Sequence, residues 1–288
     1  IFENVGTVQD GMKSIVRPRD VLDPEDARPL QVEQGGVRFE DVHFHYGKQG
    51  GVISGLTIDI RPGEKIGLVG PSGAGKSTLV NLLLRFHDLE GGRILIDGDD
   101  TAALDAARLR RGIGYVIQQI GLFPNKTIED NICTVPDLLG MDRKASRKRA
   151  HDLLEMVALD PAVFARRYPK QLSGGQQQRV GVIRALAADP PVLLMDEPFG
   201  AIDPIARDRL QAEFHALQRR LGTTVVMVTH DLEEAVRLGD RIAVMRDGRI
   251  VQIGQEVRRP RDGVGLARAG RMLDQIALAR TPGDPDAV

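Results

Sequence analysis

The sequence has a single cysteine, Cys133, among 288 residues. An internal disulfide is therefore excluded, and a lone thiol fits a reducing compartment. No apolar run approaches the roughly 18 residues that a membrane-spanning helix needs, and no secretory signal opens the chain. The formal net charge of −1 gives no overall indication of nucleic-acid binding. These absences favour a soluble globular protein with one large or two modest domains, and the start at Ile1 suggests a fragment of a longer chain.

The most specific feature present is a complete G-x-x-x-x-G-K-[ST] loop at residues 70–77. It reads Gly70, Pro71, Ser72, Gly73, Ala74, Gly75, Lys76 and Ser77, between a predicted strand at 65–69 and a predicted helix at 78–84. Its glycines let backbone N–H groups face an anion, and the helix N-terminus adds unpaired donors. Lys76 is predicted to reach the β- and γ-phosphates of a nucleotide, Ser77 to bind Mg²⁺, and Thr78 to join the nucleotide contacts. The alternative, a turn that precedes Lys-Ser by chance, is disfavoured because every fixed position is filled.

Apolar alternation and short apolar runs predict an α/β fold. The predicted strands are 37–46, 56–60, 93–97, 114–118, 192–195, 223–229, 241–245 and 249–253, and the predicted helices lie within 125–190 and 204–221. The strands before residue 98 alternate as antiparallel strands do, with a Gly-rich turn at 47–51. The buried strands that alternate with helices predict a parallel sheet with crossover connections.

Two carboxylates, Asp196 and Glu197, end the predicted strand at 192–195. Because ligands bind at the carboxyl ends of parallel strands, both are expected beside the phosphate loop. Asp196 suits a Mg²⁺ contact, usually through water, and Glu197 suits the general base that polarises an attacking water. The alternative is a solvated Asp-Glu turn before Pro198.

A second glycine-rich segment reads Leu172, Ser173, Gly174, Gly175 and Gln176. Ser173 is a good N-cap, and the two glycines expose N–H groups at a predicted helix start, where a γ-phosphate could bind. The signal is weak alone, since many capped helices bind nothing.

In combination these motifs resemble the nucleotide-binding subunit of ABC transporters, over residues 37–256. The resemblance implies a P-loop NTPase of the α/β class, with a RecA-like core, an antiparallel β subdomain and a helical ABC-specific subdomain at about 119–190. Residues 1–36 would then be a linker or the remnant of a preceding element, and 257–288 an irregular C-terminal tail.

The resemblance also implies several roles for single residues. The segment 172–176 would complete the ATP site of an opposing subunit, so that two ATP molecules lie between two chains. Tyr46 would stack on adenine, the alternative being an aromatic residue of the core. Gln118 would sense Mg²⁺ and the lytic water, with Gln119 as the alternative register, and Asp203 would lie in a loop between the subunits.

His230 matches the switch histidine that contacts the γ-phosphate and orients Glu197. The alternative is an incidental histidine after a strand. Asp231, with Glu234 three residues on, predicts a capped helix directly after it, which supports the first interpretation. Catalysis would then rest on charge neutralisation by Lys76 and Mg²⁺ and on positioning of water by the polar side chains.

The two halves resemble different branches of the family. Residues 1–98 resemble an exporter, whereas 112–254 resemble the ATPase subunit of quaternary-amine (glycine betaine, choline) importers, with the join in 99–111. The tail beyond 256 matches neither branch. These unlike parts suggest that the chain is a recombinant, a design or a mosaic. The helical region 119–170, which is expected to contact the membrane partner, has the importer-like sequence, so importer function is favoured.

The resulting hypothesis is an ATP- and Mg²⁺-dependent ATPase that powers solute import. It would form an ATP-dependent homodimer on transmembrane permease subunits, peripheral to the cytoplasmic face of the membrane, without nucleic acid. The alternatives are the nucleotide-binding domain of an exporter, a soluble ABC ATPase acting on DNA or ribosomes, and a nucleotide-binding module that no longer hydrolyses. The basic run at 143–149 could be a lipid or nucleic-acid patch, but the solvated face of an amphipathic helix is favoured.

Overall fold

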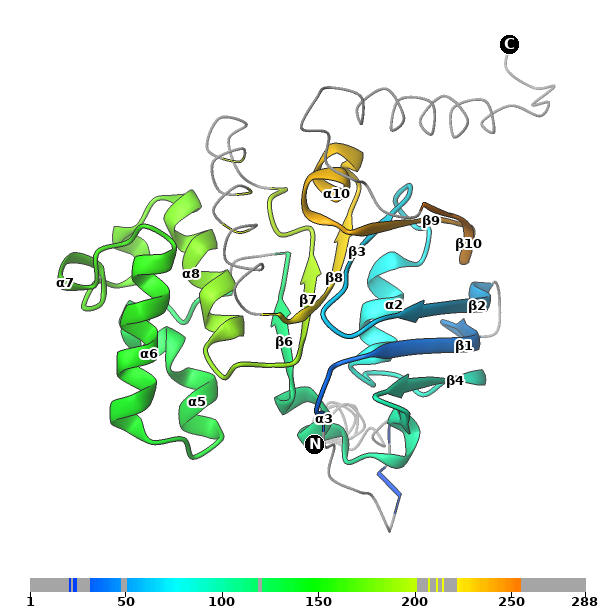
Figure 1. The fold of residues 1–288 in the computed structure, drawn as a ribbon, viewed down its shortest axis with the longest axis horizontal. Coiled ribbons are helices and arrows are strands. Elements are labelled where there is room, and N and C mark those ends of the chain that lie inside the picture. The colour runs from blue at the N-terminus through cyan, green and yellow to red at the C-terminus, as the bar shows by residue number, and fades with distance from the viewer. Residues whose placement is uncertain are drawn as a thin grey trace, which may run out of the picture.

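The computed structural model describes residues 21, 23–24, 32–47, 51–118, 121–200, 207, 211, 214 and 222–254. In this part of the chain a central six-stranded sheet separates a helical region from a four-stranded sheet (Figure 1).

The central sheet has the strand order β10-β9-β3-β8-β7-β6. Its strands are β3 (Lys65–Val69), β6 (Ile113–Val116), β7 (Val192–Asp196), β8 (Thr224–Thr229), β9 (Arg241–Arg246) and β10 (Arg249–Gly254). All neighbours are parallel except β9 and β10, which form the predicted closing hairpin. In β7, Leu193 and Met195 join one core cluster while Val192 and Leu194 join the other. Both faces are thus buried, which explains the continuous apolar runs in the sequence.

The second sheet is antiparallel along its whole order, β2-β1-β4-β5. Its strands are β1 (Val37–His45), β2 (Gly51–Ile60), β4 (Gly91–Ile96) and β5 (Asp99–Asp100). Helix α2 (Lys76–Leu83) shares one core cluster with this sheet and with the near face of the central sheet. The connection onward runs through the 3₁₀ turn η1 (Thr101–Ala103) and α3 (Ala106–Arg111) to β6. The helix that follows the phosphate loop is therefore held from both sides.

Helices cover the other face of the central sheet, as predicted for 125–190 (Figure 1). They are α4 (Ile128–Ile132), α5 (Thr134–Leu138), α6 (Arg143–Met156), α7 (Pro161–Phe164), the 3₁₀ turn η2 (Pro169–Gln171) and α8 (Gly174–Leu186), with α10 (Leu232–Leu238) over the same core. The run at 143–149 lies in α6, which buries Ala150, Leu153 and Leu154. This confirms an amphipathic helix. Within the described ranges, none of the helices has the length and apolarity needed to cross a bilayer.

Two local irregularities explain where the strands differ from the prediction. In β1, Asp41 has a φ of 47° and the pairing shifts register between Phe39 and Val42. This bulge lets Phe39 and Val42 both face the core although they are three positions apart, an odd spacing that would place them on opposite faces of a regular strand. In β2, Gly55 has a φ of 68° and breaks the alternation, so only the second half of that strand, 56–60, was predicted.

Other differences lie at the ends of elements. The strand predicted at 114–118 stops at Val116 and leaves Gln118 outside it. Of the helix predicted at 204–221, the described residues Arg207, Gln211 and Phe214 are helical.

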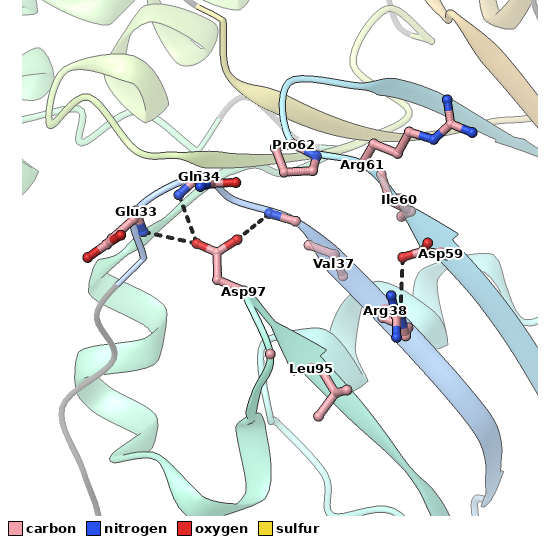
Figure 2. A pocket seen from close by; sticks show the side chains of 12 residues that line it. Glu33, Gln34, Val37, Arg38, Asp59, Ile60, Arg61, Pro62, Leu95 and Asp97 are labelled. Atoms are coloured by element: carbon pink, nitrogen blue, oxygen red, sulfur yellow. Dashed lines mark hydrogen bonds and ion pairs between the residues drawn. The ribbon is translucent and has the colours of Figure 1, made fainter.

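The last residues of the predicted N-terminal linker are bound to the antiparallel sheet by one carboxylate. Asp97 accepts hydrogen bonds at Oδ2 from the N–H groups of Glu33 and Gln34, each at 2.9 Å, and at Oδ1 from Gly36 at 2.6 Å (Figure 2). Its Oδ2 also accepts from the N–H group of Gly35 at 2.9 Å. Burial raises the pKa of Asp97, but these amides outweigh burial and leave the pKa below its usual value.

We expect Asp97→Asn to lower the stability of the fold at pH 7, by about 1 kcal/mol after allowance for solvent exposure. The neutral amide still tolerates the positive φ of 50° but accepts these hydrogen bonds less strongly. Because the pKa of Asp97 is lowered on folding, its stabilisation is present above the usual carboxyl pKa and fades as pH falls through the lowered value. Urea unfolding at several pH values measures this. Equal loss in the exposed neighbour variant Asp99→Asn would contradict the assignment.

Candidate nucleotide-binding site

The phosphate loop lies between β3 and α2, as predicted, and its glycines are required by close approaches. A Cβ on Gly70 would lie 2.2 Å from the carbonyl oxygen of Met245 in β9. A Cβ on Gly75 would lie 2.8 Å from the carbonyl oxygen of Val52, and its φ of 95° is left-handed. Gly73 also has a positive φ, of 80°. Only glycine lets the backbone turn here while contacting two other strands.

Lys76, the first residue of α2, is only 6% exposed. Its ammonium donates hydrogen bonds to the carbonyl oxygens of Gly70 at 2.8 Å and Pro71 at 2.9 Å, and so lies across the loop. Burial lowers the pKa of Lys76, while Glu197 and Asp196 act in the opposite direction. A buried cation facing two carboxylates can neutralise phosphate charge.

The side chain of Ser77 reaches the end of β7, where its Oγ donates to Asp196 Oδ1 at 3.2 Å. Burial raises the pKa of Asp196, and the hydrogen bond from Ser77 opposes this. A hydroxyl and a carboxylate are oxygen ligands of the kind that Mg²⁺ prefers, alongside phosphate oxygens and water. Among the residues that the structure describes, no three His, Cys, Asp or Glu side chains form a separate metal cluster. The hydroxyl of Ser77 and the carboxylate of Asp196 fit the predicted Mg²⁺ as ligands.

Glu197 receives two polar side chains from neighbouring strands. Gln118, after β6, donates from Nε2 to Glu197 Oε2 at 2.7 Å. His230, after β8, has Nδ1 3.2 Å from Glu197 Oε1. The backbone of Glu197 has a φ of 46°, and its N–H donates to the carbonyl oxygen of Val228 at 2.8 Å. The structure thus brings the predicted base together with Gln118 and His230. The contacts of Gln118 with Mg²⁺ and water stay a prediction, and Gln119 lies outside the described residues.

Asp231 caps α10, as predicted, by accepting from the N–H groups of Glu233 at 2.9 Å and Glu234 at 3.3 Å. The side chain of Glu234 does not return to the N-cap. It accepts instead from the hydroxyl of Thr229, whose oxygen accepts from the N–H of Asp231 at 3.0 Å. The sequence pattern predicts the cap but not this buried bond.

The second glycine-rich segment forms the predicted helix start, but apart from the phosphate loop. Ser173 and Gln176 satisfy each other's backbone N–H groups, at 3.0 and 3.3 Å. A Cβ on Gly174 or Gly175 would have nothing within 4 Å. No hydrogen bond between described side chains or backbone links this segment to residues 70–77. Its open donors are available to another molecule. Asp203 lies outside the described residues.

Tyr46, the predicted adenine contact, is 48% exposed and packs edge-on against Phe44 at 4.8 Å between ring centroids. It also packs edge-on against His87 at 5.2 Å. The half-exposed ring is not the fully packed core aromatic of the alternative, and its stacking on adenine stays a prediction. His87 was not identified from the sequence, because no local pattern joins it to Tyr46.

A family model described as "ABC transporter" matches residues 53–200. The chain belongs to the ABC transporter family. The osmoprotectant import ATP-binding protein OsmV of Salmonella typhimurium is 58% identical over 200 residues, which cover 69% of this chain and 52% of that protein. The glycine betaine/carnitine/choline transport ATP-binding protein OpuCA of Bacillus subtilis is 50% identical over 218 residues, 76% of this chain and 57% of that protein. The chain spans about half the length of these curated relatives.

Solved ABC structures confirm the predicted fold class. The ATP-binding cassette MJ0796, in a dimeric post-hydrolysis state bound to ADP and Pi, has a TM-score of 0.67 at 35% identity, over 76% of this chain and 98% of that chain. A bacterial Atm1-family ABC exporter with ATP bound has a TM-score of 0.74 at 29% identity, over 99% of this chain and 49% of that chain. The predicted domain boundaries stay predictions.

We expect Lys76→Met to weaken Mg-ATP binding at least tenfold, because the variant loses the cation that lies across the phosphate loop. Titration with a fluorescent ATP analogue measures the affinity. Lys144→Met, on the exposed surface of α6, is the control and should bind as the wild type does. Wild-type affinity in Lys76→Met would contradict the assigned role.

Proposed function

We propose that this chain binds Mg-ATP and hydrolyses it as the energy-coupling ATPase subunit of an ABC importer for osmoprotectants of the quaternary-amine type. The observation that carries the ATPase proposal is the Glu197 carboxylate, held at 2.7 Å from Gln118 Nε2 and 3.2 Å from His230 Nδ1. A carboxylate positioned in this way beside a phosphate loop can accept a proton from an attacking water.

The chemistry divides between the two sides of the site. Lys76 and the N–H groups of the loop hold the phosphates. Ser77 and Asp196 would hold Mg²⁺, which would neutralise further phosphate charge. Glu197 takes the proton of the water, while Gln118 and His230 hold its carboxylate in one orientation. Positioning of this kind is the main contribution that a protein makes to phosphoryl transfer.

A second copy of the chain would complete each nucleotide site. The segment 173–176 presents free space and helix N-terminal donors away from the chain's own phosphate loop. ATP bound to the loop of one copy can contact this segment of another, which gives an ATP-dependent homodimer. The dimeric state of the cassette MJ0796 supports this arrangement.

The importer assignment rests on the relatives, whose names describe osmoprotectant and glycine betaine, carnitine or choline transport. The partner would be a transmembrane permease, with the chain peripheral at the cytoplasmic face of the membrane. A pocket of about 370 Å³ between β6 and the helical region offers a docking place. Phe123 and Leu138 line it and are 44% and 70% exposed.

An exporter nucleotide-binding domain is the second candidate. The exporter structure matches over 99% of this chain, and the sequence of residues 1–98 resembles an exporter. A hydrolysis-deficient module is disfavoured for two reasons. Ser77 of the exporter-like half hydrogen-bonds to Asp196 of the importer-like half at 3.2 Å. Within the importer-like half, Gln118 and His230 both contact Glu197. A soluble ABC ATPase that acts on DNA or ribosomes has no structural observation in its favour.

We expect the wild type to release phosphate from Mg-ATP and Glu197→Gln to lose at least 100-fold in kcat while it still binds ATP, because the amide cannot accept the proton of water. A phosphate-release assay measures the rate, and nucleotide titration measures binding. Exposed Glu155→Gln in α6 serves as the control. If Glu197→Gln hydrolysed ATP at the wild-type rate, Glu197 would not be the base. A wild type that binds ATP without hydrolysing it would contradict the ATPase proposal itself.

A further inference from the structure

Glu234 is a buried acidic residue that the proposed chemistry does not use. It lies in the first turn of α10 and is only 4% exposed. Its Oε2 accepts from the Thr229 hydroxyl, while no described residue hydrogen-bonds to its buried Oε1. A carboxyl with one unsatisfied oxygen is costly to bury, so its position calls for a reason other than packing.

The contacts of Glu234 enclose His230. Thr229 directly precedes the histidine, and its hydroxyl binds Glu234. Asp231 directly follows the histidine, and its N–H donates to Thr229 Oγ1 at 3.0 Å. Asp231 also accepts from the N–H group of Glu234 at 3.3 Å. Both backbone neighbours of His230 are therefore tied to one point on α10.

The side chain of His230 contacts Glu197 rather than Glu234. Its ring is exposed on the side of the nucleotide site, where Nδ1 lies 3.2 Å from Glu197 Oε1. Released from Thr229 and Asp231, the loop could turn the ring away from Glu197 without disturbing either strand. Displacements of about 1 Å at such sites can cost on the order of 100-fold in rate.

We propose that Glu234 is a positioning residue for hydrolysis, which acts through Thr229 to hold His230 against Glu197. This inference rests on the ATPase function proposed above.

The charged groups that influence Glu234 are Asp231, Arg207 and His230. Burial raises the pKa of Glu234 to about 7, and the hydrogen bond from Thr229 opposes the shift. Near neutral pH the carboxyl is thus partly protonated. A neutral amide of the same shape can still accept from Thr229. The Glu234→Gln variant therefore keeps this hydrogen bond while it removes the negative charge.

The test compares kcat and KM for Mg-ATP in full-length variants. Glu234→Gln should stay within about twofold of wild type. Glu234→Ala and Thr229→Val should lower kcat about 10- to 100-fold, with less than a twofold change in KM, because the phosphate-binding residues are untouched. Glu233→Ala, an exposed substitution in the same turn of α10, should behave as wild type.

Imidazole NMR spectra supply a second measurement that does not depend on activity. The His230 signal, assigned with His230→Ala, should move in Glu234→Ala and Thr229→Val but not in Glu234→Gln or Glu233→Ala. If the wild type binds ATP without hydrolysing it, the ATPase proposal fails while the NMR spectra still decide the positioning role.

If Glu234→Ala does not fold, Thr229→Val and Thr229→Ser replace it in the test. Wild-type kcat and a wild-type His230 signal are then expected only in the serine variant, which keeps the hydroxyl. An unchanged kcat or an unchanged His230 signal in folded Glu234→Ala or Thr229→Val would overturn the inference.

Discussion

The parallel pairing of four strands is the constraint on which the site depends. In the central sheet Val69 pairs with Thr229, Asp196 with Val228, and Val116 with Met195. Strands in this register end at one edge of the sheet, so the segments that follow them must meet there. The phosphate loop, Glu197, His230 and Gln118 are those segments. The backbone hydrogen bonds between the strands therefore bring the polar side chains of these segments together.

Burial on both faces of the central sheet keeps those strand ends in place. Helix α2 packs on one face together with the antiparallel sheet, and α8 and α10 share the core of the other face. Apolar side chains cover both faces, and the polar groups of the candidate site lie at the edge. Two of the positive φ values in the described chain, at Gly75 and Glu197, lie in segments that are proposed to contact phosphate or water.

The features that could be predicted from the sequence are those that a short run of neighbouring residues determines. The phosphate loop, the two carboxylates at the end of β7 and the serine cap of α8 each follow from a short run of residues with one plausible geometry. Asp97 shows the limit, because its bonds reach residues 61 to 64 positions earlier in the chain. The bulge at Asp41 and the break at Gly55 were missed for a related reason, since each changes the periodicity on which strand prediction depends. Glu234 matched a cap pattern, but its side chain bonds to Thr229 instead.

The central claim is that ATP joins two copies through the loop at 70–77 of one and the segment at 173–176 of the other. The most direct test is the light-scattering mass of Glu197→Gln with and without Mg-ATP, since blocked hydrolysis should preserve the closed state. The account predicts one copy without nucleotide, two copies with Mg-ATP, and one copy again when Ser173→Arg is added. A one-copy mass for Glu197→Gln in both conditions, despite measured ATP binding, would contradict it.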